Sequence, residues 1–326
     1  MTLRDPPGER SPADRLPFGV VNLDKPPGPS AHQVAGWARD AVDDALAERG
    51  ADGGRCDAGS SRPVVDRVAH GGTLDPKVTG SLPMLLGDAA RCAQVFDDVR
   101  KEYVAVLELH GPAPTDLERT VAGFEGPIYQ KPPRKSAVRR DVRVREIYAL
   151  DVLERRGRQA LLRVQCDAGT YVRKLCHDLG LALGTAAHMG DLRRTATGTF
   201  DDAGLTTMED LVDALAFWVE SDPGPLQEVV APAERALAGL SRVTIAESAA
   251  REVAEGAPVY APGVLSADPA TRTDVTGRRA PQPAGEGERV ACFTPDGIAV
   301  CLGRCVGDPG ADSGVVVDLD RVLVRH

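Results

Sequence analysis

Apolar and polar positions along the first two thirds of the chain predict strands and helices in alternation. Apolar runs predict strands at residues 18–23, 103–109 and 160–166. The run at 103–109 places apolar residues on both faces of the strand, so we expect that strand in the middle of a sheet. These elements together indicate a domain that contains both helices and sheet.

Apolar residues spaced three and four positions apart predict three helices. Ser30 with Gln33 has the pattern of a capping box at the start of the first helix. Thr170 and Thr207 are the expected N-caps of the other two. The residues expected to face inward are Val34, Trp37, Ala38, Ala41, Val42 and Leu46, then Val172, Leu175, Cys176 and Leu179, then Leu211, Leu215 and Trp218.

The pattern changes at residues 221–225, where the sequence reads Ser-Asp-Pro-Gly-Pro. Short strands separated by Gly and Pro follow, with a spacing typical of a small β-barrel. We therefore expect an extension at 1–17, a large domain at 18–225, a linker at 226–241 and a barrel at 242–326. Residues 49–62 are expected as a surface insertion and residues 267–287 as a long exposed hairpin loop. The barrel strands are expected at 241–245, 259–265, 288–293, 298–306 and 314–324.

The amino-acid composition indicates the salt and redox conditions in which the chain works. Its 48 acidic and 39 basic residues give a net charge of −9, and only six of the basic residues are Lys. An acidic, Lys-poor surface suits concentrated salt, although a GC-rich genome would also favour Arg over Lys. The seven cysteines include no CxxC pair, so neither a zinc ribbon nor a disulfide scaffold is expected. We therefore expect the protein to work in the reducing cytoplasm. No apolar run approaches the roughly 18 residues that a membrane span needs.

One segment opposes the overall charge. Residues 131–145 contain seven basic residues and one acidic residue. A strongly positive stretch in an acidic protein indicates a site for a polyanion, whereas the ordinary interpretation of a charge run is a solvated face. The candidate contacts are Lys131, Arg134, Lys135, Arg139 and Arg140.

Two further segments carry residues suited to chemistry. In the first, Gly-Gly-Thr-Leu-Asp-Pro at 71–76, Pro76 fixes a turn that holds the carboxylate of Asp75 at a loop tip. In the second, Gly169 permits a turn after a strand, and Tyr171 and Arg173 emerge on the first helical turn. An aromatic ring and a guanidinium suit a flat substrate and an acidic partner. The alternatives are an ordinary turn, a packed Tyr171 and a surface Arg173.

With these segments the chain resembles the TruB-type pseudouridine synthases, in the archaeal branch related to dyskerin, the catalytic subunit of box H/ACA ribonucleoproteins. The resemblance covers about residues 18–326 and implies an α+β fold, with a catalytic domain on a mixed or antiparallel sheet and a small C-terminal β-barrel. The matching stretches are NLDKPPGPS at 22–30, HGGTLDP at 70–76, KEY at 101–103, YQKPP at 129–133, GTYVRKLCHDLG at 169–180, GTAAHMGDLRRT at 184–195 and GAPVYAPG at 256–263.

The resemblance implies roles for the residues at matching positions. Asp75 would be the catalytic aspartate and Arg173 its ion-pair partner, a pair whose loss, if buried, typically costs about 3–5 kcal/mol. Tyr103 would stack on the target base and Tyr171 would be a second active-site tyrosine. The resemblance also places His70 near the flipped nucleotide and Leu192 in the pocket lining.

The resemblance also implies how RNA is held. The segment around Arg134 and Lys135 corresponds to a loop that closes over RNA. The last domain corresponds to a PUA domain, in which Gly256 and Ala257 would let the RNA backbone approach closely. No cofactor and no metal are implied.

The chemistry agrees with these roles. The N1–C1′ bond of uridine must break, the base must rotate, and C5 must bond to C1′. A stacked base cannot do this, so it must first be flipped out, at a cost of a few kcal/mol. Stacking on tyrosine, worth about 1–3 kcal/mol per base, can offset that cost. Asp75 could act as a nucleophile at C1′ or assist proton removal to form a glycal, and the sequence is compatible with both.

Three functions are therefore weighed. The favoured one is an RNA-guided synthase acting on rRNA, with guide RNA and the small H/ACA proteins as partners, and with activity on uridine 55 of tRNA left open. The second is a stand-alone tRNA synthase acting at that position. The third is a non-catalytic RNA-binding scaffold, which would have no need for Asp75, Tyr103 and Arg173.

Overall fold

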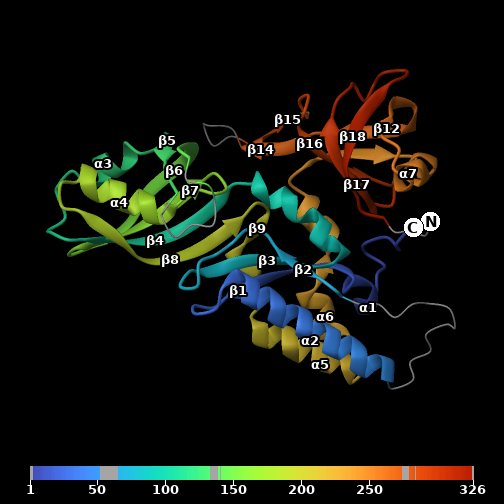
Figure 1. The fold of residues 1–326 in the computed structure, drawn as a ribbon, viewed down its shortest axis with the longest axis horizontal. Helices are drawn as coiled ribbons and strands as arrows, with labels where there is room; N and C mark the ends of the chain where they lie inside the picture. The colour runs from blue at the N-terminus through green and yellow to red at the C-terminus, as the bar shows by residue number, and fades with distance from the viewer. Residues whose placement is uncertain are drawn as a thin grey trace.

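The computed structural model describes residues 3–51, 65–132, 139, 141–273, 279–282 and 284–324. Its larger part is built on a ten-stranded mixed sheet with the order β10-β1-β3-β8-β4-β7-β6-β5, in which β2 also pairs with β3 and β9 with β8 (Figure 1). The strands are β1 (Phe18–Lys25), β2 (Val68–His70), β3 (Thr79–Gly87), β4 (Lys101–Leu109), β5 (Gly126–Gln130), β6 (Arg143–Arg156), β7 (Gln159–Cys166), β8 (Ala187–Thr197), β9 (Phe200–Asp201) and β10 (Ala231–Pro232).

A short parallel pairing of β3 with β8 joins the two halves of this sheet, whereas the other pairings in it are antiparallel. Gly80 allows this approach, because its φ is +99° and a Cβ there would lie 2.2 Å from the carbonyl oxygen of Arg194. Arg193 on β8 strengthens the join with two hydrogen bonds of 3.0 Å to the carboxylate of Asp24 on β1. Side chains from both halves of the sheet therefore meet along this line.

Helices cover the two halves separately. In Figure 1, α2 (Ala31–Ala51) and α5 (Met208–Val219) lie beside β1, whereas α3 (Leu117–Ala122) and α4 (Val172–Ala182) lie beside β4 to β8. No helix in the described ranges is long and apolar enough to cross a membrane. The remaining helical segments of this part are α1 (Pro12–Arg15), η1 (Asp88–Asp97), η2 (Asp202–Gly204), α6 (Gly224–Val229) and η3 (Ala233–Leu237).

Most of the expected elements are confirmed. The strand expected at 103–109 is β4, which lies between β7 and β8. Ser30 and Gln33 form the expected capping box, with bonds of 2.9 and 3.2 Å between each backbone N–H and the other side chain. Thr207 caps α5 in the same way, with Asp210.

Three local expectations are wrong. The side chain of Trp37 is 50% exposed, because it lies at the edge of the apolar stripe of α2 rather than on it. The N-cap of α4 is Tyr171 rather than Thr170. Arg49, expected to begin an insertion, lies within α2, its guanidinium donating to the carbonyl oxygen of Trp218; residues 52–62 of that segment lie outside the described part.

The C-terminal part forms a second, six-stranded sheet with the order β12-β18-β17-β16-β11-β13. The strand expected at 259–265 is divided in two, because η4 (Ala261–Gly263), which contains Pro262, interrupts it. The helix α7 (Glu247–Ala254) was not expected. The hairpin expected within 267–287 contains β14 (Ala270–Thr273) and β15 (Arg279–Gln282). The strands of the second sheet are β11 (Ser241–Ile245), β12 (Val259–Tyr260), β13 (Val264–Asp268), β16 (Arg289–Phe293), β17 (Ala299–Cys305) and β18 (Val315–Val322).

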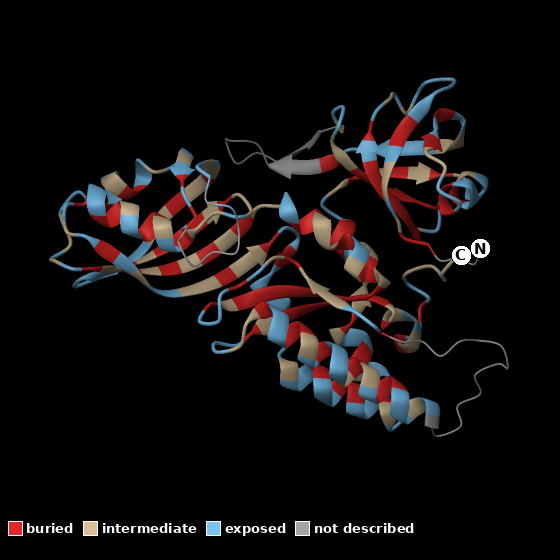
Figure 2. Ribbon diagram, in the orientation of Figure 1, coloured by how far each residue is buried: buried red, intermediate tan, exposed pale blue. Residues whose placement is uncertain are grey.

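The two sheets share a hydrophobic cluster, visible as buried residues on both sides of the junction in Figure 2. Phe18 and Phe96 of the first part pack in one cluster with Phe293 and Leu302 of the second. Removal of the C-terminal sheet would therefore expose apolar surface on the first part, and point variants are the cleaner way to test its role.

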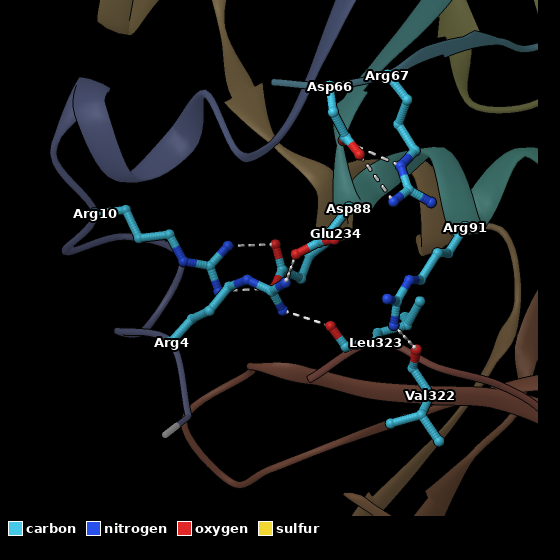
Figure 3. Close-up of polar contacts among 9 residues, drawn as sticks. All are labelled: Arg4, Arg10, Asp66, Arg67, Asp88, Arg91, Glu234, Val322 and Leu323. Atoms are coloured by element: carbon cyan, nitrogen blue, oxygen red, sulfur yellow. Dashed lines mark hydrogen bonds and ion pairs between the residues drawn. The ribbon is translucent and has the colours of Figure 1, made fainter. Parts of the chain in front are cut away.

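The N-terminal segment reinforces this junction, as Figure 3 shows. Arg10 is 2% exposed and donates two hydrogen bonds of 2.8 Å to Glu234. Arg4 donates to the carbonyl oxygen of Leu323 at 2.6 Å and to Asp88 at 3.1 Å. Residues expected as an extension and a linker thus pack between the two sheets.

Candidate active site

Asp75 lies in the loop between β2 and β3 and forms an ion pair with Arg173, the second residue of α4. The two residues are 98 positions apart in the chain and come from opposite halves of the first sheet. Their side chains are 56% and 54% exposed. The expected pair is therefore present, but the cost expected for breaking a buried pair does not apply to it. The carboxylate is held in place and remains open to solvent.

Three buried basic side chains hold the Asp75 loop from beneath. Lys25, the last residue of β1, donates to the carbonyl oxygens of Pro26, Pro76 and Val78 at 2.9, 3.0 and 2.8 Å. Burial lowers the pKa of Lys25, and the negative charge of Asp75 partly opposes this effect. The ammonium of Lys25 thus fixes the backbone on both sides of the catalytic candidate.

Lys101 and Arg194 hold the glycines that begin the loop. Lys101 Nζ donates to the carbonyl oxygen of Gly71 at 3.3 Å, and Arg194 Nη2 donates to that of Gly72 at 3.1 Å. Burial, together with the positive charge of Arg194, lowers the pKa of Lys101 to about 7. The sequence analysis did not identify Lys25, Lys101 and Arg194 as site residues. A basic residue within a strand or at its end nevertheless indicates a side chain that needs buried hydrogen-bond partners.

The two expected tyrosines differ in exposure. Tyr103 on β4 is only 8% exposed and lies opposite Arg194 of β8. Burial raises the pKa of the Tyr103 phenol, against the opposing effect of the Arg194 charge. Tyr171 is partly exposed at the N-terminus of α4. In the free protein, Tyr171 therefore offers more ring surface than Tyr103.

The other expected site residues lie on strands of the same sheet. His70 ends β2, and burial and the Arg194 charge lower its pKa. Its buried Nδ1 has no hydrogen-bond partner in the described part of the chain. Leu192 is partly buried on β8, in register with Ala105.

The expected RNA contacts are described only in part. Lys131 is exposed directly after β5. Arg139 is exposed and forms an ion pair with Asp141 at 2.9 Å. Arg134, Lys135 and Arg140 lie outside the described residues.

In the C-terminal part of the chain, Gly256 follows α7 with a φ of +95°. Its N–H donates to the carbonyl oxygen of Val253 at 3.0 Å. Gly256 is exposed and Ala257 is partly exposed. Both residues therefore lie just beyond the C-terminal end of α7.

Among the residues that the structure describes, no group of three or more His, Cys, Asp and Glu could hold a metal ion. The groups that the structure brings together at the join of the two half-sheets are a solvent-accessible carboxylate, a guanidinium and aromatic rings.

Two family models match the chain. Residues 62–116 match the N-terminal domain of the TruB family pseudouridylate synthases, and residues 173–238 match the C-terminal domain of tRNA pseudouridylate synthase B. The first of these segments contains Asp75 and Tyr103, and the second begins at Arg173.

Relatives match over nearly the whole length. A "Probable tRNA pseudouridine synthase B" of Haloarcula marismortui is 62% identical over 324 residues, which are 99% of this chain and 94% of the relative. A protein of the same name from Methanocaldococcus jannaschii is 38% identical over 98% of this chain and 86% of its own length. The chain belongs to the TruB family of pseudouridine synthases, and it is an enzyme of that class with close relatives in halophilic archaea.

Solved structures agree. The chain is 37% identical to a protein in a structure described as a Cbf5-Nop10-Gar1 complex, with a TM-score of 0.82 over 98% of this chain and 88% of the other. It is 35% identical to a protein in a structure of an H/ACA RNP bound to a substrate RNA containing 2′-deoxyuridine, with a TM-score of 0.81 over 99% and 90%.

Proposed function

We propose that this pseudouridine synthase is the catalytic subunit of a guide-RNA particle and isomerises uridines in rRNA that base pairing selects. The observation that carries the catalytic part is the Asp75–Arg173 pair, in which a carboxylate is fixed yet more than half exposed at the join of the two half-sheets. The guided part is supported by similarity, over 98–99% of the chain, to the proteins in the Cbf5 and H/ACA RNP structures.

In this proposal a flipped uridine enters beside Asp75. The carboxylate acts on the sugar, either by bonding to C1′ or by assisting proton removal to form a glycal, while the N1–C1′ bond breaks. The freed base rotates between aromatic rings and C5 bonds to C1′, as the Asp75–C1′ bond breaks in the first route or as the proton returns to C2′ of the glycal in the second. The proton on C5 is then lost and N1 gains one, so the product is an isomer of the substrate. Arg173 holds the carboxylate in position throughout. Tyr171 stacks on the base first, and the largely covered ring of Tyr103 does so after the site opens.

RNA is held at two places besides this site. The basic segment at 131–145, with Lys131 and Arg139 in its described part, contacts phosphates beside the site. The C-terminal residues 242–326 act as a PUA domain that grips the single-stranded end of a guide RNA, or the CCA end of a tRNA, next to Gly256 and Ala257. A separate buried cluster beneath α7 and the six-stranded sheet supports the assignment of a second structural unit.

The small H/ACA proteins are the proposed protein partners, because Nop10 and Gar1 accompany the similar protein in the solved complex. In a protein of net charge −9, partners and base pairing would supply much of the RNA affinity, since phosphate contacts weaken steeply as salt rises. The six cysteines of the described part are free thiols, which supports a reducing cytoplasm as the place of work.

A stand-alone tRNA synthase is the second candidate, favoured by the name that the relatives carry. The scaffold without catalysis has little support, because the chain belongs to an enzyme family and the Asp75–Arg173 pair is assembled.

The test is a pseudouridine assay in high KCl, with purified chain alone or with guide RNA and the partner proteins. Substrates are an rRNA-type target matched to the guide, the same target with a mismatched guide, and a tRNA transcript. We expect guide and partners to raise the rate on the matched target by orders of magnitude, and the mismatched guide to have no effect. Efficient modification of tRNA by the chain alone, with no guided activity, would replace this proposal with the stand-alone one.

A further inference from the structure

Gln130 is a buried polar residue that joins the basic segment to the active site. It is the last residue of β5, directly before Lys131, and is 2% exposed. A buried amide needs hydrogen-bond partners, because leaving its donor and acceptor unpaired is costly. Both groups are directed at one residue: Gln130 Oε1 accepts from the Tyr171 N–H at 2.9 Å, and Gln130 Nε2 donates to the Tyr171 carbonyl oxygen at 3.2 Å.

These two bonds fix the backbone at the start of α4. Tyr171 is the N-cap of this helix and its own side chain makes no capping bond, unlike the Ser, Thr, Asp or Asn usually found there. The Tyr171 carbonyl oxygen accepts the first helical bonds, from Lys174 and Leu175 at 2.9 and 3.0 Å. Gln130 therefore caps α4 from a strand 41 residues away, through the backbone of Tyr171.

The neighbouring strand is tied to the same loop. Asp167, four residues before Tyr171, accepts from the Glu146 N–H at 2.9 Å and from the Tyr148 hydroxyl at 2.6 Å, both on β6. Because β5 and β6 pair along Gly126–Gln130, the hairpin that carries the basic segment and the loop that carries Tyr171 form one hydrogen-bonded unit.

We infer that Gln130 is a positioning residue for pseudouridine formation: through the Tyr171 backbone it orients the Tyr171 ring and, two residues later, the Arg173 guanidinium that pairs with Asp75. It thereby couples RNA held by the basic segment to the geometry of the reacting site. The inference rests on the proposed function, because it takes Tyr171, Arg173 and Asp75 as the residues at the reaction.

Gln130→Glu tests this role with almost no change of shape. One carboxylate oxygen can still accept from the Tyr171 N–H, but the other then faces the Tyr171 carbonyl oxygen, to which the amide donated. Protonation of the introduced carboxyl restores a donor at that position. Burial raises the pKa of such a carboxyl, while Arg143 opposite it on β6 and Arg173 at the start of α4 oppose that effect.

The measurement is the steady-state kcat and the KM for RNA between pH 5.5 and 8.5. We expect Gln130→Glu to lower kcat at least tenfold at pH 8 with little change in KM, and to recover several-fold relative to wild type as the pH falls. Gln130→Met, which restores no donor at any pH, should lower kcat throughout the range. Gln227→Glu, which makes the same change at an exposed position of α6, should match wild type.

Thermal unfolding of each variant shows whether it is folded, and Gln130→Met serves if Gln130→Glu is not. Wild-type kcat and wild-type pH dependence in both Gln130 variants would overturn the inference, as would a rise in KM with kcat unchanged. Because wild type is measured beside them, a failure of the proposed function appears separately, as absence of pseudouridine in wild type itself.

Discussion

Replacing Arg173 by Met should separate catalysis from stability. The change removes the ion pair to Asp75 and leaves an apolar side chain of similar length. Both side chains of the pair are more than half exposed, and ion pairs of that exposure are worth about 0–1 kcal/mol. In a chain of 326 residues, 1 kcal/mol corresponds to a shift in Tm of about 1.5 °C, so the Tm of the variant should lie within about 2 °C of wild type.

The loss of activity should be larger than the loss of stability. When a flipped base covers the site, water leaves the pair, and a hydrogen bond to a charged group is then worth about 1.5–3 kcal/mol. That range corresponds to a fall in kcat/KM of about 10- to 150-fold. Tm by circular dichroism and single-turnover pseudouridine formation measure the two effects.

Arg163→Met is the matched control. Arg163 on β7 pairs with Asp151 on β6 at 2.8 Å, with both side chains 45% exposed, so its loss should shift Tm equally and leave activity intact. Two results would refute the reasoning: an Arg173 variant that loses about 3 kcal/mol of stability, as for a buried pair, or one as active as the control.

Two further variants test the support of the loop and the second sheet. Burial lowers the pKa of Lys101 in the folded protein to about 7, from an ordinary value of 10.5. Between these pH values the unfolded chain binds more protons, so the free energy of unfolding of wild type rises with pH, by about 2 kcal/mol from pH 7 to pH 9. In Lys101→Met this rise should disappear. Denaturant unfolding at both pH values measures this, and an equal rise in the variant would contradict the role of burial. Ala257→Glu should weaken guide-RNA binding about tenfold through charge repulsion, while Ala311→Glu, on an exposed loop of the same part, should not; equal binding by both would remove Ala257 from the RNA surface.

Local patterns were sufficient for elements that local interactions stabilise. The apolar run at β1 and the capping box of Ser30 and Gln33 were predictable because each depends on residues a few positions apart. β3 was not predicted as a strand, since Gly80, Pro83 and Gly87 are typical of a loop. Its pairing with β1 and β8 involves residues distant in sequence, and that long-range context overrides strand propensity.

The same limit applies to the site. Asp75 and Arg173 could be named because their motifs resemble those of a known family, and their ion pair is present. Their exposure could not be predicted, since it depends on how two half-sheets meet. The buried partners of Lys101 and the contact of Gln130 with Tyr171 likewise join distant segments, so no local pattern reveals them.

The central claim is that the Asp75 carboxylate performs the chemistry. The most direct measurement is single-turnover pseudouridine formation by Asp75→Ala on a guided target, with RNA affinity and Tm measured on the same preparation. The account predicts no detectable product, with both other quantities close to wild type, because the half-exposed side chain contributes little to folding. Retention of more than about a tenth of the wild-type rate, a loss of only ~1.4 kcal/mol, would contradict it.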